Sequence, residues 1–85
     1  MQGAFFLSME LKKISELYRE TKLYKNMTPY LACALAEGFG EGEGATIDEQ
    51  LTAWQWLHDT GGAYRLQGFY GRAVTTLIEQ GAIAQ

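Results

Sequence analysis

Two arginines and two tyrosines lie close together between positions 64 and 72. With a glutamine they form the segment richest in ligand-binding side chains: Tyr64, Arg65, Gln67, Tyr70 and Arg72. Arginine beside an aromatic ring can hold an anionic or planar ligand, such as a nucleotide signal, through charge and stacking. The alternative is structural: Arg72 bonds a carboxylate or carbonyl while the tyrosines fill the core. The sequence favours the structural alternative and leaves the ligand site open.

Residues that commonly act in catalysis are few in this chain and poorly placed. His58 and Asp59 are neighbours in an expected helix, where successive side chains diverge by about 100° and cannot form a dyad. Cys33 is the one cysteine of the chain, and a small buried apolar residue is the better interpretation of it. His58 is then expected to be a hydrogen-bonded residue at the edge of the core. We therefore predict no catalytic residue and no enzyme.

The acidic, glycine-rich stretch from Gly38 to Gly44 does not match a known ion site. Its carboxylates, with Asp48 and Glu49, lack the spacing of a calcium loop. One cysteine and one histidine are too few for zinc. No Gly-Lys-Ser/Thr follows the glycines, as it would in a phosphate-binding loop. We expect a flexible acidic loop, no metal and no cofactor.

The helix that must position these residues is predicted to begin at Thr46 and to reach Asp59. Thr46 and Glu49 have the spacing of a capping box, in which each side chain bonds the other residue's backbone amide. Trp54 falls on the apolar face of this helix, whereas Trp56 points elsewhere. Trp56 therefore needs a second surface to cover it, either the N-terminal half of the chain or another subunit.

Glycines divide the C-terminal half of the chain. Gly61 and Gly62 are predicted to end the first helix in a tight corner, and Gly81 is predicted to end a second amphipathic helix. Gly68 and Gly71 allow two interpretations. They let another backbone approach closely, or Gly68 marks a break so that the helix proper starts near Phe69, which we favour. Residues 46–83 then form a helical hairpin.

The N-terminal half is expected to supply two more helices. One covers residues 7–24, and the other begins at Pro29 with Thr28 as its cap. The fold class is therefore all-α, a small bundle of about four helices in a single domain. Residues 1–45 contribute the N-terminal helices and the acidic loop.

Five short motifs follow one another between residues 49 and 83. They are Ala53-Trp54-Gln55, Asp59-Thr60-Gly61, Leu66-Gln67-Gly68, Tyr70-Gly71-Arg72 and Leu77-Ile78-Glu79-Gln80-Gly81. In order and spacing they resemble a family of small tailed-bacteriophage proteins. The resemblance implies a phage origin and a helical hairpin, but no activity. It does not extend to residues 1–45.

The charge of the chain is uneven. The net charge is −3, with +2 over residues 1–27 and −5 over residues 28–85. An acidic body repels nucleic acid and attracts a partner with a basic surface. Aromatic residues make up 13% of this 85-residue chain, which favours a homodimer that covers some of them. No run is long enough to span a membrane.

These features together favour a protein-interaction function. We expect a small acidic phage protein that binds a host or phage protein in the cytoplasm of an infected bacterium, with Trp54 and Trp56 as anchors. The alternative is a protein that binds or sequesters a nucleotide signal. A third possibility is a component of the virion.

Overall fold

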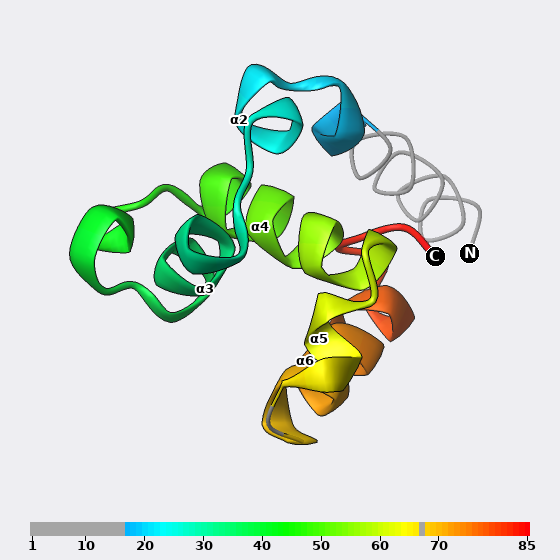
Figure 1. Cartoon of the computed structure of the whole chain (residues 1–85). Coiled ribbons are helices and arrows are strands. Elements are labelled where there is room, and N and C mark those ends of the chain that lie inside the picture. The colour runs from blue at the N-terminus through cyan, green and yellow to red at the C-terminus, as the bar shows by residue number, and fades with distance from the viewer. Residues whose placement is uncertain (1–16, 67) are drawn as a thin grey trace.

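Helices account for the regular structure of the residues that the computed structural model describes, 17–66 and 68–85 (Figure 1). In chain order the elements, with η for a 3-10 helix, are η1 (Tyr18–Glu20), α2 (Lys22–Lys25), α3 (Pro29–Glu37), η2 (Gly40–Gly42), α4 (Ile47–Asp59), α5 (Gly62–Arg65) and α6 (Gly68–Glu79). The all-α class is confirmed for these residues. Their helices are shorter and more numerous than the four that we predicted.

α4 is the element on which the others pack. Its N-terminus has the predicted capping box: the Thr46 hydroxyl accepts from the Glu49 amide at 3.1 Å, and Glu49 accepts from the Thr46 amide at 2.9 Å. η1, α2, α3, α5 and α6 each contact α4. The core lies around it and consists of Met27, Ala32, Leu35, Ala53, Leu57, Ala63, Tyr70, Val74 and Ile83.

α3 begins as its sequence predicts and holds the glycine-rich segment against it. The Thr28 hydroxyl accepts from the Leu31 amide at 3.2 Å, with Pro29 in the first helical turn. The segment that follows is not simply a flexible loop, because it contains η2 and buries Gly42 against α3. A β-carbon on Gly42 would overlap the carbonyl group of Ala34 and lie 2.7 Å from the α-carbon of Leu35.

The chain changes direction twice after α4, whereas we predicted a single tight corner. Gly61 adopts a left-handed conformation (φ 77°), which lets the chain turn from α4 into the short α5. Leu66 is extended, which confirms the predicted break, although α6 starts at Gly68 and not at Phe69. Figure 1 shows α5 leading away from the end of α4 and α6 returning. Residues 46–83 therefore contain three helices, not a two-helix hairpin.

The predicted helix over residues 7–24 lies partly outside the described residues, and the described part is interrupted at Thr21. This residue is extended (ψ 154°). Its hydroxyl donates to the Tyr18 carbonyl at 2.9 Å and accepts from the Tyr24 amide at 3.1 Å. Thr21 thus ends η1 and caps α2, because its side chain competes with the helical hydrogen bonds of the backbone.

The C-terminal segment folds back onto the core. Gly81 (φ 76°) ends α6 as predicted, and the Gly81 and Ala82 amides bond the carbonyls of Ile78 and Leu77. Ile83 is then buried in the core. Among the described residues, no helix has the length and apolar character needed to cross a bilayer.

Candidate functional site

Both tryptophans of α4 pack within the chain. Trp54 is half-buried, with its ring centroid 5.5 Å from that of Tyr70 in α6. Trp56 is also half-buried and lines a groove together with Pro29 and Cys33 of α3. The N-terminal half therefore covers part of Trp56, which was the first of the two alternatives. Both tryptophans keep part of their side chain exposed, and their predicted role as partner anchors stays a prediction.

Most of the polar groups at the Arg/Tyr corner bond within the chain. Arg65 donates through Nη2 to the carbonyl of Thr60 at 2.9 Å. The Tyr64 hydroxyl lies 2.7 Å from Nδ1 of His58, which confirms His58 as a hydrogen-bonded residue at the core edge. It is thus Arg65, and not the expected Arg72, that holds the corner through a carbonyl. Gln67, the remaining candidate between these residues, lies outside the described residues.

Tyr70 fills the core, as the structural alternative requires. Its hydroxyl donates to the carboxylate of Glu37 at the end of α3. Burial, followed by this hydrogen bond, raises the pKa of Tyr70 above its ordinary value. Tyr70 therefore joins α6 to α3 and does not face solvent. Cys33 is half-buried and packs against the same core.

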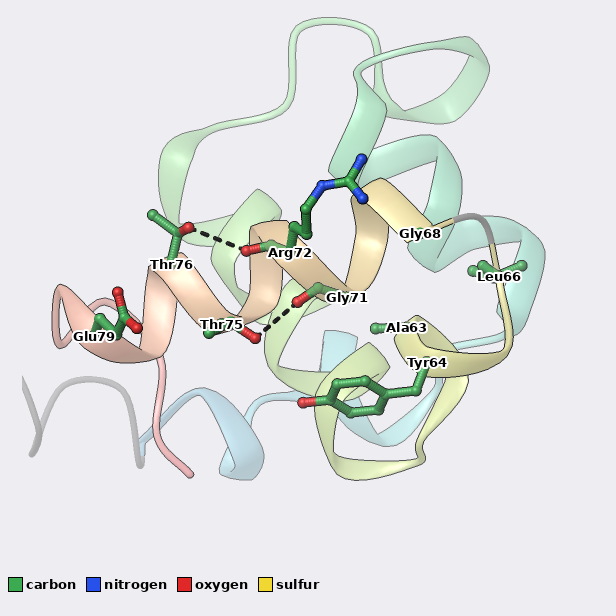
Figure 2. Close-up of a pocket in the computed structure, with 9 residues that line it drawn as sticks. All are labelled: Ala63, Tyr64, Leu66, Gly68, Gly71, Arg72, Thr75, Thr76 and Glu79. Atoms are coloured by element: carbon green, nitrogen blue, oxygen red, sulfur yellow. Dashed lines mark hydrogen bonds between the residues drawn. The ribbon is translucent and has the colours of Figure 1, made fainter.

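Arg72 differs from the other corner residues. It lies on an open groove of about 580 Å³ along α6 and α5 (Figure 2). Its guanidinium makes no hydrogen bond or ion pair with any residue that the structure describes. Figure 2 shows this side chain extending away from α6, with the Tyr64 ring on the other side of that helix. The groove is lined by Ala63, Tyr64, Leu66, Gly68, Gly71, Arg72, Thr75, Thr76 and Glu79.

A polar network at the end of α4 was not predicted. Arg19 binds Asp59 through Nε and Nη2, both at 2.8 Å, and the Tyr24 hydroxyl donates to the same carboxylate at 2.6 Å. Burial raises the pKa of Asp59, but the hydrogen bonds from Arg19 and Tyr24 and the arginine charge outweigh it, so the pKa is lowered. Burial and the hydrogen bond to Asp59 in turn raise the pKa of Tyr24 to about 12.

Gln55 extends this network to the C-terminal segment. Its side chain is fully buried, and its amide group donates to Ala84 O at 2.8 Å and accepts from Ala84 N at 2.7 Å. It also donates to Asp59 at 3.1 Å. Gln55 and Asp59 are four residues apart, but the other partners in the network are 29 to 40 residues apart, so no local sequence signal could have identified it. Its members satisfy one another, so it holds the fold together.

One end of the molecule gathers exposed carboxylates and exposed apolar side chains. We call it the acidic end: it comprises α3, η2 and the start of α4, with Glu37, Glu41, Glu43, Asp48 and Glu49 exposed. Ile47, Tyr30 and Phe39 are 73%, 61% and 42% exposed there. The rings of Tyr30 and Phe39 contact each other edge to face, with centroids 6.1 Å apart. Sequence analysis found the carboxylates but not these three apolar residues.

The carboxylates of the acidic end do not form a metal centre. Within residues 17–66 and 68–85, no three histidine, cysteine or acidic side chains gather closely enough to hold a metal ion. Glu49 is used in the capping box, and Asp48 accepts from the Tyr18 hydroxyl at 3.3 Å.

Comparison with known proteins adds no relative: the chain matches no protein-family model, no curated protein and no solved structure.

Proposed function

We propose that the chain is a binding protein, not an enzyme, and that its acidic end docks a protein with a basic and partly apolar surface. The observation that carries the proposal is the exposure of Ile47, Tyr30 and Phe39 among carboxylates. Large apolar side chains in a polar, charged rim are the usual composition of a protein-binding surface.

The charge pattern specifies the partner. No lysine or arginine occurs between Asn26 and Tyr64, whereas this stretch carries six acidic residues. Glu41 and Glu43 make no hydrogen bond or ion pair with the described residues, so their charges remain available to a partner. A basic protein is attracted to such a surface, while nucleic acid is repelled.

The resemblance of residues 49–83 to small tailed-phage proteins supports a bacterial or phage protein as the partner, bound in the cytoplasm of an infected cell. The acidic end lies mostly outside that resemblance.

A photo-crosslinking amino acid at position 47 tests the proposal in cells. We expect one crosslinked protein with a basic surface, and we expect its yield to fall when the crosslinker at position 47 is combined with Glu43→Lys. The matched control places the crosslinker at Phe69, which is also exposed and lies on α6, and combines it with Glu20→Lys. Equal capture by both pairs, or no loss with Glu43→Lys, would show that the acidic end is not the docking surface.

A purified partner allows the interface to be measured directly. We expect Ile47→Ala with Glu43→Lys to weaken binding by about tenfold or more, since an apolar contact is lost and a charge is reversed. Phe69→Ala with Glu20→Lys should leave the dissociation constant unchanged. Binding should also weaken as salt concentration rises.

A nucleotide-binding function is the second candidate, because Arg72 lies on the groove along α6 and has no hydrogen-bond or ion-pair partner among the described residues. Fewer residues support this candidate than the sequence predicted, because the side chains of Arg65, Tyr64 and Tyr70 form hydrogen bonds within the chain. The test is a melting-temperature series with a panel of cyclic dinucleotides. A shift that Arg72→Ala removes supports this candidate, and no shift with any nucleotide rejects it.

A further inference from the structure

Among the described residues, the side of α6 that carries Arg72 is open to solvent and borders α5. We call it the outer face of α6, and it consists of Gly68, Gly71, Arg72, Thr75, Thr76 and Glu79. All of these residues are exposed except Gly71, which is half-buried. They recur at intervals of three and four, so they lie along one side of the helix.

Neither glycine of this face is required by its contacts with the described residues. Both have negative φ, which any residue can adopt. A β-carbon on Gly71 would lie 3.6 Å from Tyr64 Cδ1, an ordinary contact, and one on Gly68 would meet only the mobile end of Arg72 at 3.2 Å. Glycine weakens a helix relative to alanine. Among the described residues, Gly71 has room for a β-carbon, so this glycine leaves space for a second molecule to approach the α6 backbone.

The two threonines of the face present an apolar surface. The Thr75 hydroxyl donates to the carbonyl of Gly71, and the Thr76 hydroxyl to the carbonyl of Arg72, each at 3.0 Å (Figure 2). Because both hydroxyls already have an acceptor within α6, covering these side chains leaves no unsatisfied donor. The middle of the face can thus be buried at little cost.

The outer face of α6 carries a positive charge, Arg72, and a negative charge, Glu79, on opposite sides of its midpoint. Arg72 and Glu79 are seven residues apart, nearly two helical turns, so both project from the same side of α6. Neither makes an ion pair with a described residue. Each lies about 5 Å along the axis from the midpoint between Thr75 and Thr76, one on either side.

We propose that the outer face of α6 pairs with the same face of a second copy, antiparallel, about a two-fold axis at Thr75 and Thr76. This register places Arg72 of each copy opposite Glu79 of the other, and the glycines let the two backbones approach. A surface that carries both charges about its own midpoint is self-complementary, as a two-fold interface requires. The pairing goes beyond the proposed docking function, because it uses a surface separate from the acidic end.

Charge exchange tests the pairing, read out as the dimer dissociation constant from sedimentation equilibrium at low salt. We expect Arg72→Glu and Glu79→Arg each to weaken the dimer by about tenfold or more. In the two-fold dimer, each substitution places two pairs of like charges opposite one another. The double variant restores both pairs and should recover most of the loss. Lys25→Glu is the control, because Lys25 is exposed on α2 and should not affect dimerisation.

The possible outcomes separate the pairing from its alternatives. A wild-type chain that stays monomeric at all concentrations overturns it, as does a dimer that none of these variants weakens. Weakening by the single variants without recovery in the double variant also overturns the antiparallel register. A monomer that binds a cyclic dinucleotide through Arg72 would identify the face as a ligand site. Capture of a partner by the acidic end is independent of all these results.

Discussion

Two glycines, Gly42 in η2 and Gly71 in α6, occupy opposite kinds of environment. Gly42 is buried, and a β-carbon there would overlap the backbone of α3. Gly71 has room for a β-carbon and borders an open groove. Packing within one chain explains the first glycine and leaves the second unexplained.

The regions around these glycines differ in the same way. Around Gly42, η2 packs on α3, and at the end of α4 the side chains of Asp59, Arg19 and Gln55 bond one another. On the outer face of α6, Arg72 and Glu79 have no described ion-pair partner. The packing of Gly42 and the Asp59 network hold the fold together, whereas the outer face of α6 is the surface that we propose for contact with a second copy. Three experiments should distinguish the two regions.

The largest effect is expected from Gly42→Ala. Because the added methyl group meets backbone atoms of Ala34 and Leu35, η2 must move away from α3. We expect the free energy of unfolding to fall by about 3 kcal/mol, the upper range for overpacking in a core. Urea denaturation followed by tryptophan fluorescence measures it. An unchanged midpoint would mean that η2 does not pack on α3 as described.

Local signals in the sequence predicted the parts of the fold that depend on neighbouring residues. The Thr46 capping box, the Thr28 cap with Pro29, the break after Leu66 and the stop at Gly81 each involve residues within a few positions of one another. Their energetics are local, so their spacing in the sequence is sufficient to identify them.

Features that join distant residues were missed. The Asp59 network links positions 40 residues apart, and no periodicity records such a contact. The burial of Gly42 could not be predicted either. A glycine-rich stretch is typical of a loop whether or not another helix covers it. The candidate site was recognised in part: the residues of the corner were identified, but the hydrogen bond to a carbonyl was predicted for Arg72 and is made by Arg65.

A smaller effect is expected from titration of Asp59. Its pKa in the folded chain is lowered from the ordinary value of 3.8, so its ionised form stabilises the fold. This contribution is fully present above about pH 4 and is lost as the pH falls through the folded pKa. Since the network is partly exposed, we expect it to be worth about 1 kcal/mol at neutral pH.

Asp59→Asn isolates that contribution. The difference in unfolding free energy between the wild type and this variant should be constant from pH 7 to pH 5 and should shrink below about pH 4. Urea denaturation at a series of pH values provides the measurement. A difference that stays constant down to pH 2 would show that the Arg19–Asp59 pair does not stabilise the fold.

The smallest effect, with the opposite sign, is expected from Gly71→Ala at protein concentrations low enough for a monomer. Alanine fits beside Tyr64 and restricts the unfolded chain more than glycine does, so the free energy of unfolding should rise by about 0.5–1 kcal/mol. At high concentration the same methyl group should weaken the dimer, because it keeps the two α6 backbones apart. Thermal denaturation at both concentrations measures the two effects. A substitution that stabilises the chain equally at both would leave Gly71 without a role in pairing, whereas opposite signs would show that the glycine is kept for contact with a second copy and not for the fold.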